Sequence, residues 1–268
     1  MHGMRCLRHT RQPQHAANLQ RKALQRCIVV AKAAQGSGPP TVADTKQKFL
    51  QAYRKPVPGV YTTIVQELLV QQHLMRYNKS YQYDEVFALG FVSVFDQVLD
   101  GLPSASQEQV FAAYINALDE DPARYRADAE KVEGWAKALS GAADLKPDAS
   151  GGELQQLLAG IAERAAANNF LYTKFFAIGL FRLLELTGAK DPKALEALVR
   201  SMNVPLESVN RDLMTYKGVL SKLGAAKEMM RELVARERKK AAEREAEKKA
   251  KQDAELAAAK AESADVQA

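Results

Sequence analysis

The most constraining part of this sequence is the apolar segment between Pro58 and Leu102. In its first half, apolar side chains recur at the spacing that places them on one face of an α-helix: Tyr61, Ile64, Val65, Leu68 and Leu69. In its second half, the run from Val86 to Phe95 reads VFALGFVSVF, with serine as its only polar side chain. A helix that is apolar nearly all round belongs inside a core, so we expect a central buried helix here.

Three further features indicate how this central helix is used. Its ten residues from Val86 to Phe95 are about half of the length that crosses a bilayer, so a membrane span is excluded. Asp84 precedes the run and is placed to act as its N-cap. Gly90 has no Cβ, which leaves room for a neighbouring helix to approach closely. The sequence therefore predicts a core helix that another helix contacts at short range.

A second apolar stretch, between Asn168 and Leu186, shows mixed helical spacings and is expected to pack against the central helix. Charged residues interrupt it, which argues against a membrane span. Asp121-Pro122 and Asp191-Pro192 each pair an N-cap with a proline in the first helical turn. We predict an all-α fold: a compact multi-helix domain of about seven or eight helices over residues 41–223, followed by a long charged C-terminal helix.

The N-terminal end of the chain differs from this body in charge. Residues 1–33 contain seven basic residues and no acidic residue. Removing these seven from the 38 basic residues leaves 31 against 32 acidic residues, a formal charge of −1. A basic leader without acidic residues is typical of an organelle transit peptide, whereas a retained basic arm that binds nucleic acid is the alternative. Residues 34–40, rich in glycine and proline, are predicted to be a flexible linker.

The C-terminal end is predicted to be a charged helix or weak coiled coil over residues 224–262, with a disordered tail at 263–268. Glu245/Lys249 and Glu247/Lys251 are spaced as i, i+4 ion pairs, each worth about 0.2 to 0.5 kcal/mol. The segment lacks the regular leucine and valine of a stable coiled coil. Two hypotheses stay open: a solvated helix, or a docking element that forms salt-sensitive ionic contacts with a partner. Its charges of both signs argue against binding to RNA.

The chemistry available to a mature chain is limited. Cleavage of the leader near Ala31 would remove Cys6 and Cys27, the only cysteines, and three of the four histidines. Cysteine nucleophiles, disulfides and Cys/His zinc sites are then excluded. The charges between Asp119 and Asp128 are interpreted as helix caps and surface ion pairs, since acid–base catalysis needs a buried carboxylate pair with separated pKa values. We predict no enzyme, no catalytic residue, no metal site and no cofactor.

His73 is the weak candidate for a cofactor-binding residue, because it is the one histidine outside the leader. It would serve as an axial ligand to chlorophyll or haem, which gives the alternative function of a chlorophyll- or tetrapyrrole-binding carrier. We favour a structural histidine, hydrogen-bonded to a neighbour such as Tyr81 or Tyr83. Those two tyrosines are expected to pack against the helices on either side while Asp84 caps the next helix.

A series of short motifs follows in order along the body: Thr41-Val-Ala-Asp-Thr45, Glu67-Leu-Leu-Val70, Tyr81-Gln-Tyr-Asp84, Phe87-Ala-Leu-Gly90, Asp121-Pro-Ala-Arg-Tyr-Arg-Ala-Asp128 and Trp135-Ala136. Together they resemble the thylakoid formation family, plastid and cyanobacterial proteins of photosystem II biogenesis and repair. The resemblance covers roughly residues 41–223. It implies that the leader is a chloroplast transit peptide, where the composition leaves mitochondrion and chloroplast open.

The resemblance also implies a function. A protein of this family is expected to be a non-enzymatic accessory factor for thylakoid formation and for photosystem II assembly and repair. It would be found in the chloroplast, in the stroma and at the stromal face of the thylakoid membrane, with which it associates peripherally. The implied partners are the thylakoid FtsH protease complex, which it would bind and stabilise, and photosystem II-associated proteins. No nucleic acid partner is expected.

Overall fold

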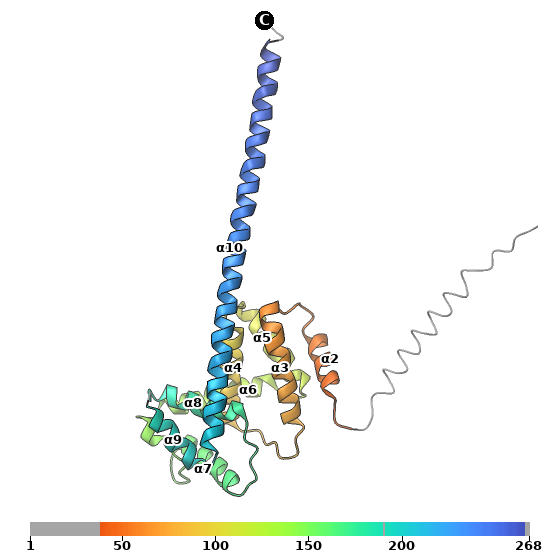
Figure 1. The fold of residues 1–268 in the computed structure, drawn as a ribbon. Helices are drawn as coiled ribbons and strands as arrows, with labels where there is room; N and C mark the ends of the chain where they lie inside the picture. The colour runs from red at the N-terminus through yellow and green to blue at the C-terminus, as the bar shows by residue number, and fades with distance from the viewer. Residues whose placement is uncertain (1–37, 190, 266–268) are drawn as a thin grey trace, which may run out of the picture. The chain divides into compact units, whose positions relative to one another are not determined.

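The computed structural model describes residues 38–189 and 191–265, and the regular elements of this part of the chain are helical (Figure 1). The predicted all-α fold is confirmed. The predicted transit peptide at 1–33 and residues 34–37 of the predicted linker lie outside the described residues. The helices are α2 (Val42–Ala52), α3 (Gly59–Arg76), α4 (Glu85–Leu99), α5 (Ser104–Ala117), α6 (Pro122–Lys137), α7 (Glu153–Ala166), α8 (Lys174–Leu186), α9 (Pro192–Ser201) and α10 (Leu206–Asp265), with a short 3-10 turn η1 (Ala142–Asp144) between α6 and α7.

Helix α4 is the centre of the core, as its apolar sequence predicts. Eleven of its 15 residues are buried, and it packs most extensively against α8 and α6. Phenylalanine rings on α4 meet aromatic rings of three other helices: Phe91 lies 5.2 Å from Phe175 of α8, 5.6 Å from Tyr125 of α6 and 5.5 Å from Tyr114 of α5, centroid to centroid. These tilted and edge-on arrangements are the favoured geometries of buried aromatic pairs.

The contact between α4 and α8 depends on two glycines. A Cβ atom placed on Gly90 of α4 would lie 1.9 Å from the carbonyl oxygen of Phe175, and one placed on Gly179 of α8 would lie 2.1 Å from the carbonyl oxygen of Val86. At each glycine, the backbone of the other helix thus lies in the space that a Cβ atom would occupy. The close approach predicted at Gly90 is confirmed, and Gly179 supplies the matching space on α8.

Three aspartates and one threonine are the N-caps of α4, α6, α8 and α9. The Asp84 carboxylate accepts a hydrogen bond of 2.8 Å from the Phe87 amide at the start of α4, which confirms the predicted cap. Asp121 and Asp191 cap α6 and α9 in the same way. Helix α8 begins at Lys174, six residues after the start of the apolar stretch at Asn168. It begins there because the Thr173 hydroxyl accepts a hydrogen bond from the Phe176 amide and caps the helix.

Helix α10 changes character along its length. Its first part packs on α8, α9, α3 and α4 through buried residues that include Val209, Leu213 and Leu223. From residue 228 to residue 252 every side chain is exposed. The long charged helix is therefore confirmed. It continues to Asp265, so the disordered tail predicted at 263–268 is wrong for residues 263–265, and residues 266–268 lie outside the described part. Among the described residues, no helix combines the length and the apolar character that a membrane crossing requires.

Candidate functional site

His73 lies in the interior, near the end of α3, and only 5% of its surface is exposed. Its Nδ1 atom is 2.8 Å from the Thr45 hydroxyl of α2, and its ring lies 4.8 Å from the Tyr77 ring. The prediction that His73 bonds to a neighbour such as Tyr81 or Tyr83 is thus wrong. The partner is instead a residue 28 positions earlier in the chain, which α2 brings against α3.

The burial of His73 favours the neutral form of its imidazole. Burial lowers the pKa of the imidazole, although the nearby Asp44 acts in the opposite direction. With Nδ1 bonded to Thr45, only Nε2 is left to bind an iron or magnesium ion, and the ring is covered by protein. This geometry favours the structural interpretation. The tetrapyrrole hypothesis stays a prediction that binding experiments can test.

The tyrosines that follow α3 behave as expected. The Tyr83 and Tyr81 rings meet Phe87 of α4 edge-on, at 6.2 and 5.9 Å between centroids. The Tyr83 hydroxyl donates to Asp128 at 2.8 Å, and burial, with this bond as the second cause, raises the pKa of the phenol. Burial raises the pKa of the Tyr81 phenol as well, and both side chains close the core around α4.

The acidic segment before α6 is only partly the set of surface pairs that we predicted. Asp119 forms an exposed ion pair with Lys48 at 2.6 Å, and Asp121 is a helix cap. Glu120 differs, because its side chain is only 12% exposed and pairs with Arg76 at 2.7 Å. Burial raises its pKa, against the opposing effects of the Tyr125 hydroxyl and Arg76. Glu120 thus belongs to the interior, where we interpret it as a structural anchor.

Glu120 joins a hydrogen-bond network that links α3, α5 and α6. The Tyr125 hydroxyl donates to Glu120. The side-chain amide of Gln72 donates to the Tyr125 oxygen at 3.2 Å and accepts from the Tyr114 hydroxyl at 3.3 Å. Such a network satisfies polar groups that the sequence places inside the core. Among the described residues, no group of three His, Cys, Asp or Glu side chains is placed to hold a metal ion.

The outer surface of α10 carries an unusual group of apolar side chains. Met229, Met230, Leu233 and Val234 are 72%, 46%, 53% and 45% exposed, and we call them the α10 patch. Positions 229 and 233, and 230 and 234, are four residues apart, so each pair lies on the same side of the helix. Apolar side chains that gather in this way mark a contact surface more often than isolated ones do.

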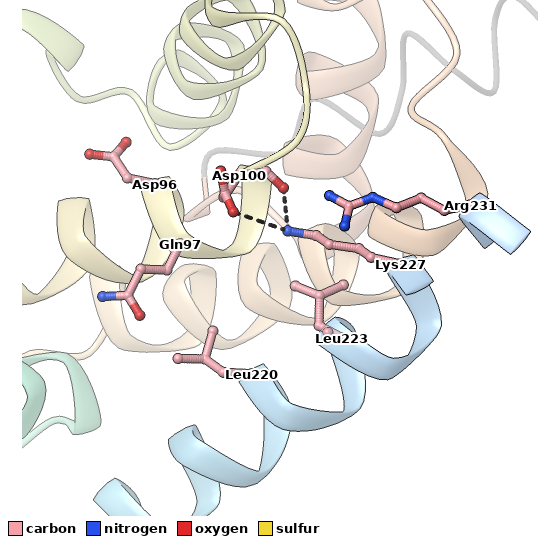
Figure 2. Close-up of a pocket in the computed structure, with 8 residues that line it drawn as sticks. Asp96, Gln97, Asp100, Leu220, Leu223, Lys227 and Arg231 are labelled. Atoms are coloured by element: carbon pink, nitrogen blue, oxygen red, sulfur yellow. Dashed lines mark hydrogen bonds and ion pairs between the residues drawn. The ribbon is translucent and has the colours of Figure 1, made fainter. Parts of the chain in front are cut away.

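A groove of about 560 Å³ lies beside the α10 patch, between the end of α4 and α10 (Figure 2). There Lys227 of α10 reaches the last turn of α4, where its amino group donates to the Asp100 carbonyl oxygen and lies 3.9 Å from the Asp100 carboxylate. The Tyr61 hydroxyl donates to the same carbonyl at 3.3 Å. A cation at this position complements the negative end of the α4 dipole. Lys227 thereby anchors α10 to the core just before the patch begins.

The described residues form an all-α protein with a group of exposed apolar side chains on its long C-terminal helix. Comparison with known proteins identifies its relatives. The family model of the thylakoid formation protein matches residues 41–245, and the chain belongs to this family. The match extends beyond the residues that suggested the resemblance and includes the α10 patch.

Similar proteins come from plants and cyanobacteria. Protein THYLAKOID FORMATION1, chloroplastic, of Oryza sativa is 49% identical over 225 residues, which are 83% of this chain and 77% of that protein. The Arabidopsis thaliana protein of that name is 51% identical over 76% of this chain and 69% of its own length. Protein Thf1 of a Nostoc species is 34% identical over 76% of this chain and 93% of its own. The solved structure of Psb29 covers 76% of this chain and 100% of its own, with a TM-score of 0.61 and 29% identity.

Proposed function

We propose that this protein is a non-enzymatic accessory factor of the chloroplast that acts in thylakoid formation and in photosystem II assembly and repair. It binds and stabilises the thylakoid FtsH protease complex from the stroma, in peripheral association with the thylakoid membrane. Membership of the thylakoid formation protein family and the chloroplastic plant relatives support the general role. The observation that carries the binding role is the exposed α10 patch.

The α10 patch is suited to binding another protein. Fully burying one Val, Leu or Met side chain contributes about 1.5 to 3 kcal/mol. Four such side chains, each 45 to 72% exposed, therefore offer several kcal/mol to a partner that covers them. Because Lys227 fixes α10 to the core immediately before the patch, little ordering of the helix is needed when a partner binds.

The charged residues around and beyond the patch favour fast, salt-sensitive association. Several are paired along the helix, as in Arg231–Glu228 at 3.3 Å and Lys251–Glu247 at 2.9 Å. The predicted Glu247/Lys251 pair thus forms, whereas Glu245 and Lys249 make no ion pair in the described part of α10. Charges at the rim of an interface raise the association rate more than the affinity.

Stabilisation of the protease follows from linkage. A factor that binds the assembled complex and not its separate subunits shifts the assembly equilibrium toward the complex. The effect grows with the concentration of free factor relative to its dissociation constant. No chemical step is required of the factor.

The test is a pull-down from solubilised thylakoids with the tagged chain in three forms. These are the unchanged sequence, the Met229→Ser/Leu233→Ser variant, and a Met214→Ser control, whose methionine is 75% exposed on an earlier turn of α10. We expect the unchanged chain and the control to recover FtsH and the double variant to lose it, with weaker recovery at high salt. Equal recovery by all three would place the contact elsewhere. A folded, unchanged chain that recovers no FtsH would refute the proposed function.

A further inference from the structure

Two apolar hollows meet at Lys174, the first residue of α8. The smaller, of about 80 Å³, lies between α3, α4, α8 and α10; most of its lining is apolar, as with Leu68, Val94 and Ile178, and Asp212 lines it as well. The larger, of about 290 Å³, lies between the end of α3 and residues 171–175 and includes Leu74, Met75 and Leu171. Lys174 and Phe175 line both hollows. We call the two hollows with Lys174 the Lys174 groove.

Lys174 is a half-buried cation without an acidic partner. Its amino group donates to the side-chain oxygen of Gln71 and lies 5.4 Å from the centre of the Phe175 ring. In the described part of the chain, no carboxylate lies within ion-pair distance of it. The two nearby acidic groups are engaged elsewhere: Glu67 accepts from Gln71 at 3.0 Å, and Asp212 accepts from the Tyr172 hydroxyl at 2.8 Å.

The environment of Lys174 makes this arrangement costly for the free protein. Burial lowers the pKa of its amino group, although the charges of Glu67 and Asp212 act in the opposite direction. An ammonium group has three hydrogen-bond donors, and Gln71 accepts from one. A half-desolvated cation gains more from a carboxylate than an exposed one does, because water screens the pair less.

One residue that lines the smaller hollow carries a buried polar atom that lacks a partner. The hydroxyl of Tyr216, a residue that lines it, is buried and makes no hydrogen bond to the described residues. Burial raises the pKa of this phenol to about 12, so it stays a neutral donor. The polar residues that line this mostly apolar hollow are Lys174, Asp212, Thr215 and Tyr216.

The rim and size of the Lys174 groove indicate what it accommodates. Leu74 and Val219, one from each hollow, are 63% and 37% exposed. The smaller hollow, at about 80 Å³, is below the roughly 150 Å³ of a cavity that holds benzene. The smaller hollow thus suits the end of one side chain, and the larger, at about 290 Å³, suits one or two side chains. Separate side-chain-sized hollows on either side of a cation match a polypeptide better than a single small ligand.

We propose that the Lys174 groove is a docking site for a partner protein segment that carries an aspartate or glutamate between large apolar side chains. The carboxylate accepts hydrogen bonds from the Lys174 amino group, and the flanking apolar side chains enter the two hollows. Among the described residues, the Lys174 ammonium has no carboxylate within ion-pair distance and favours a segment with an acidic residue, whereas the Asp212 carboxylate at the same hollow already accepts from the Tyr172 hydroxyl. The site is distinct from the α10 patch and rests on the proposed function only in that the protein acts by binding other proteins.

Selection from a random 16-residue peptide library on the purified full-length chain tests the proposal, with the selected peptides then synthesised and their affinities measured. We expect the enriched peptides to carry Asp or Glu flanked by Leu, Ile, Phe or Met. Lys174→Met, which keeps the aliphatic stem and removes the charge, should weaken their binding at least tenfold. Leu74→Ser, an exposed change that leaves the core intact, should weaken it severalfold. Lys217→Met is the matched control, since Lys217 also lies over an aromatic ring, 5.1 Å from that of Phe181, and should bind like the unchanged chain.

Each outcome decides the proposal. Acidic-apolar peptides that lose affinity in the Lys174→Met and Leu74→Ser chains, and not in the control, support it. Enrichment without acidic residues, binding that neither variant changes, or no enrichment would overturn it. The assay contains no protease, so a negative result leaves the FtsH pull-down unaffected, and failure of that pull-down leaves this result unaffected.

Discussion

Replacing Gly90 by alanine tests whether the contact between α4 and α8 holds the core together. The added Cβ would lie 1.9 Å from the Phe175 carbonyl oxygen, whereas real Cβ contacts are essentially never below 3.0 Å. The two helices must therefore separate by at least about 1 Å. The obstacle is backbone and not a flexible side-chain end, so we expect a cost at or above the upper end of the 1 to 3 kcal/mol typical of overpacking.

The chain provides its own control for this change. Gly160 of α7 is exposed, and a Cβ placed on it would meet nothing within 4 Å. The same substitution should there stabilise the protein by about 0.5 to 1 kcal/mol, because alanine is the better helix former. For a body of this size, 1 kcal/mol corresponds to a shift in melting temperature of about 2 to 4 °C. Gly90→Ala should thus melt about 6 to 12 °C lower, and Gly160→Ala a few degrees higher.

Fluorescence of Trp135 is the appropriate readout of this unfolding. It is the single tryptophan, it lies on α6, and its side chain packs against the core. Circular dichroism would also report the exposed half of α10, which need not melt with the body. A Gly179→Ala chain should behave like Gly90→Ala, and the double variant should cost less than the sum, because both changes separate the same helices. Equal melting temperatures for Gly90→Ala and the unchanged chain would refute the reasoning.

Three further predictions concern polar side chains in the interior. Burial raises the pKa of Asp84 to about 6, so the folded state binds this proton more tightly than the unfolded state and loses stability as the pH rises from about 4 to 6. In urea titrations at pH 8, the Asp84→Asn variant should therefore have an unfolding free energy up to about 3 kcal/mol higher than that of the unchanged chain. Near pH 4 the two unfolding free energies should be equal. A difference that stays constant between pH 4 and pH 8 would contradict this prediction. Thr45→Val should cost about 1 to 3 kcal/mol in the same assay, since it leaves the buried Nδ1 of His73 without its partner, and a neutral effect would show that the bond is dispensable. His73→Ala should bind no less chlorophyll than the unchanged chain in absorption titrations, and loss of stoichiometric binding would revive the carrier hypothesis.

The sequence predicts the core well because its strongest patterns are local. The run from Val86 to Phe95 has so few polar side chains that no exposed position suits it, and α4 is buried accordingly. Caps such as Asp84 act on amides two or three residues away, so their role follows from short-range spacing. The interior role of Glu120 was missed. Its neighbours Asp119 and Asp121 lie at the surface, and only the folded chain places Arg76 and Tyr125 around it.

The sequence by itself determines the helical fold, the central helix, the charged C-terminal helix and the family, because periodicity, caps and ordered motifs are written in neighbouring residues. Tertiary structure alone decides which groups meet across long separations. Thr45 reaches His73 over 28 positions, and Lys227 reaches Asp100 over 127. In the sequence, Lys174 is one charge that interrupts an apolar stretch; in the fold it lies between two hollows. Burial and pairing depend on the packing of distant helices, and local patterns cannot encode that packing.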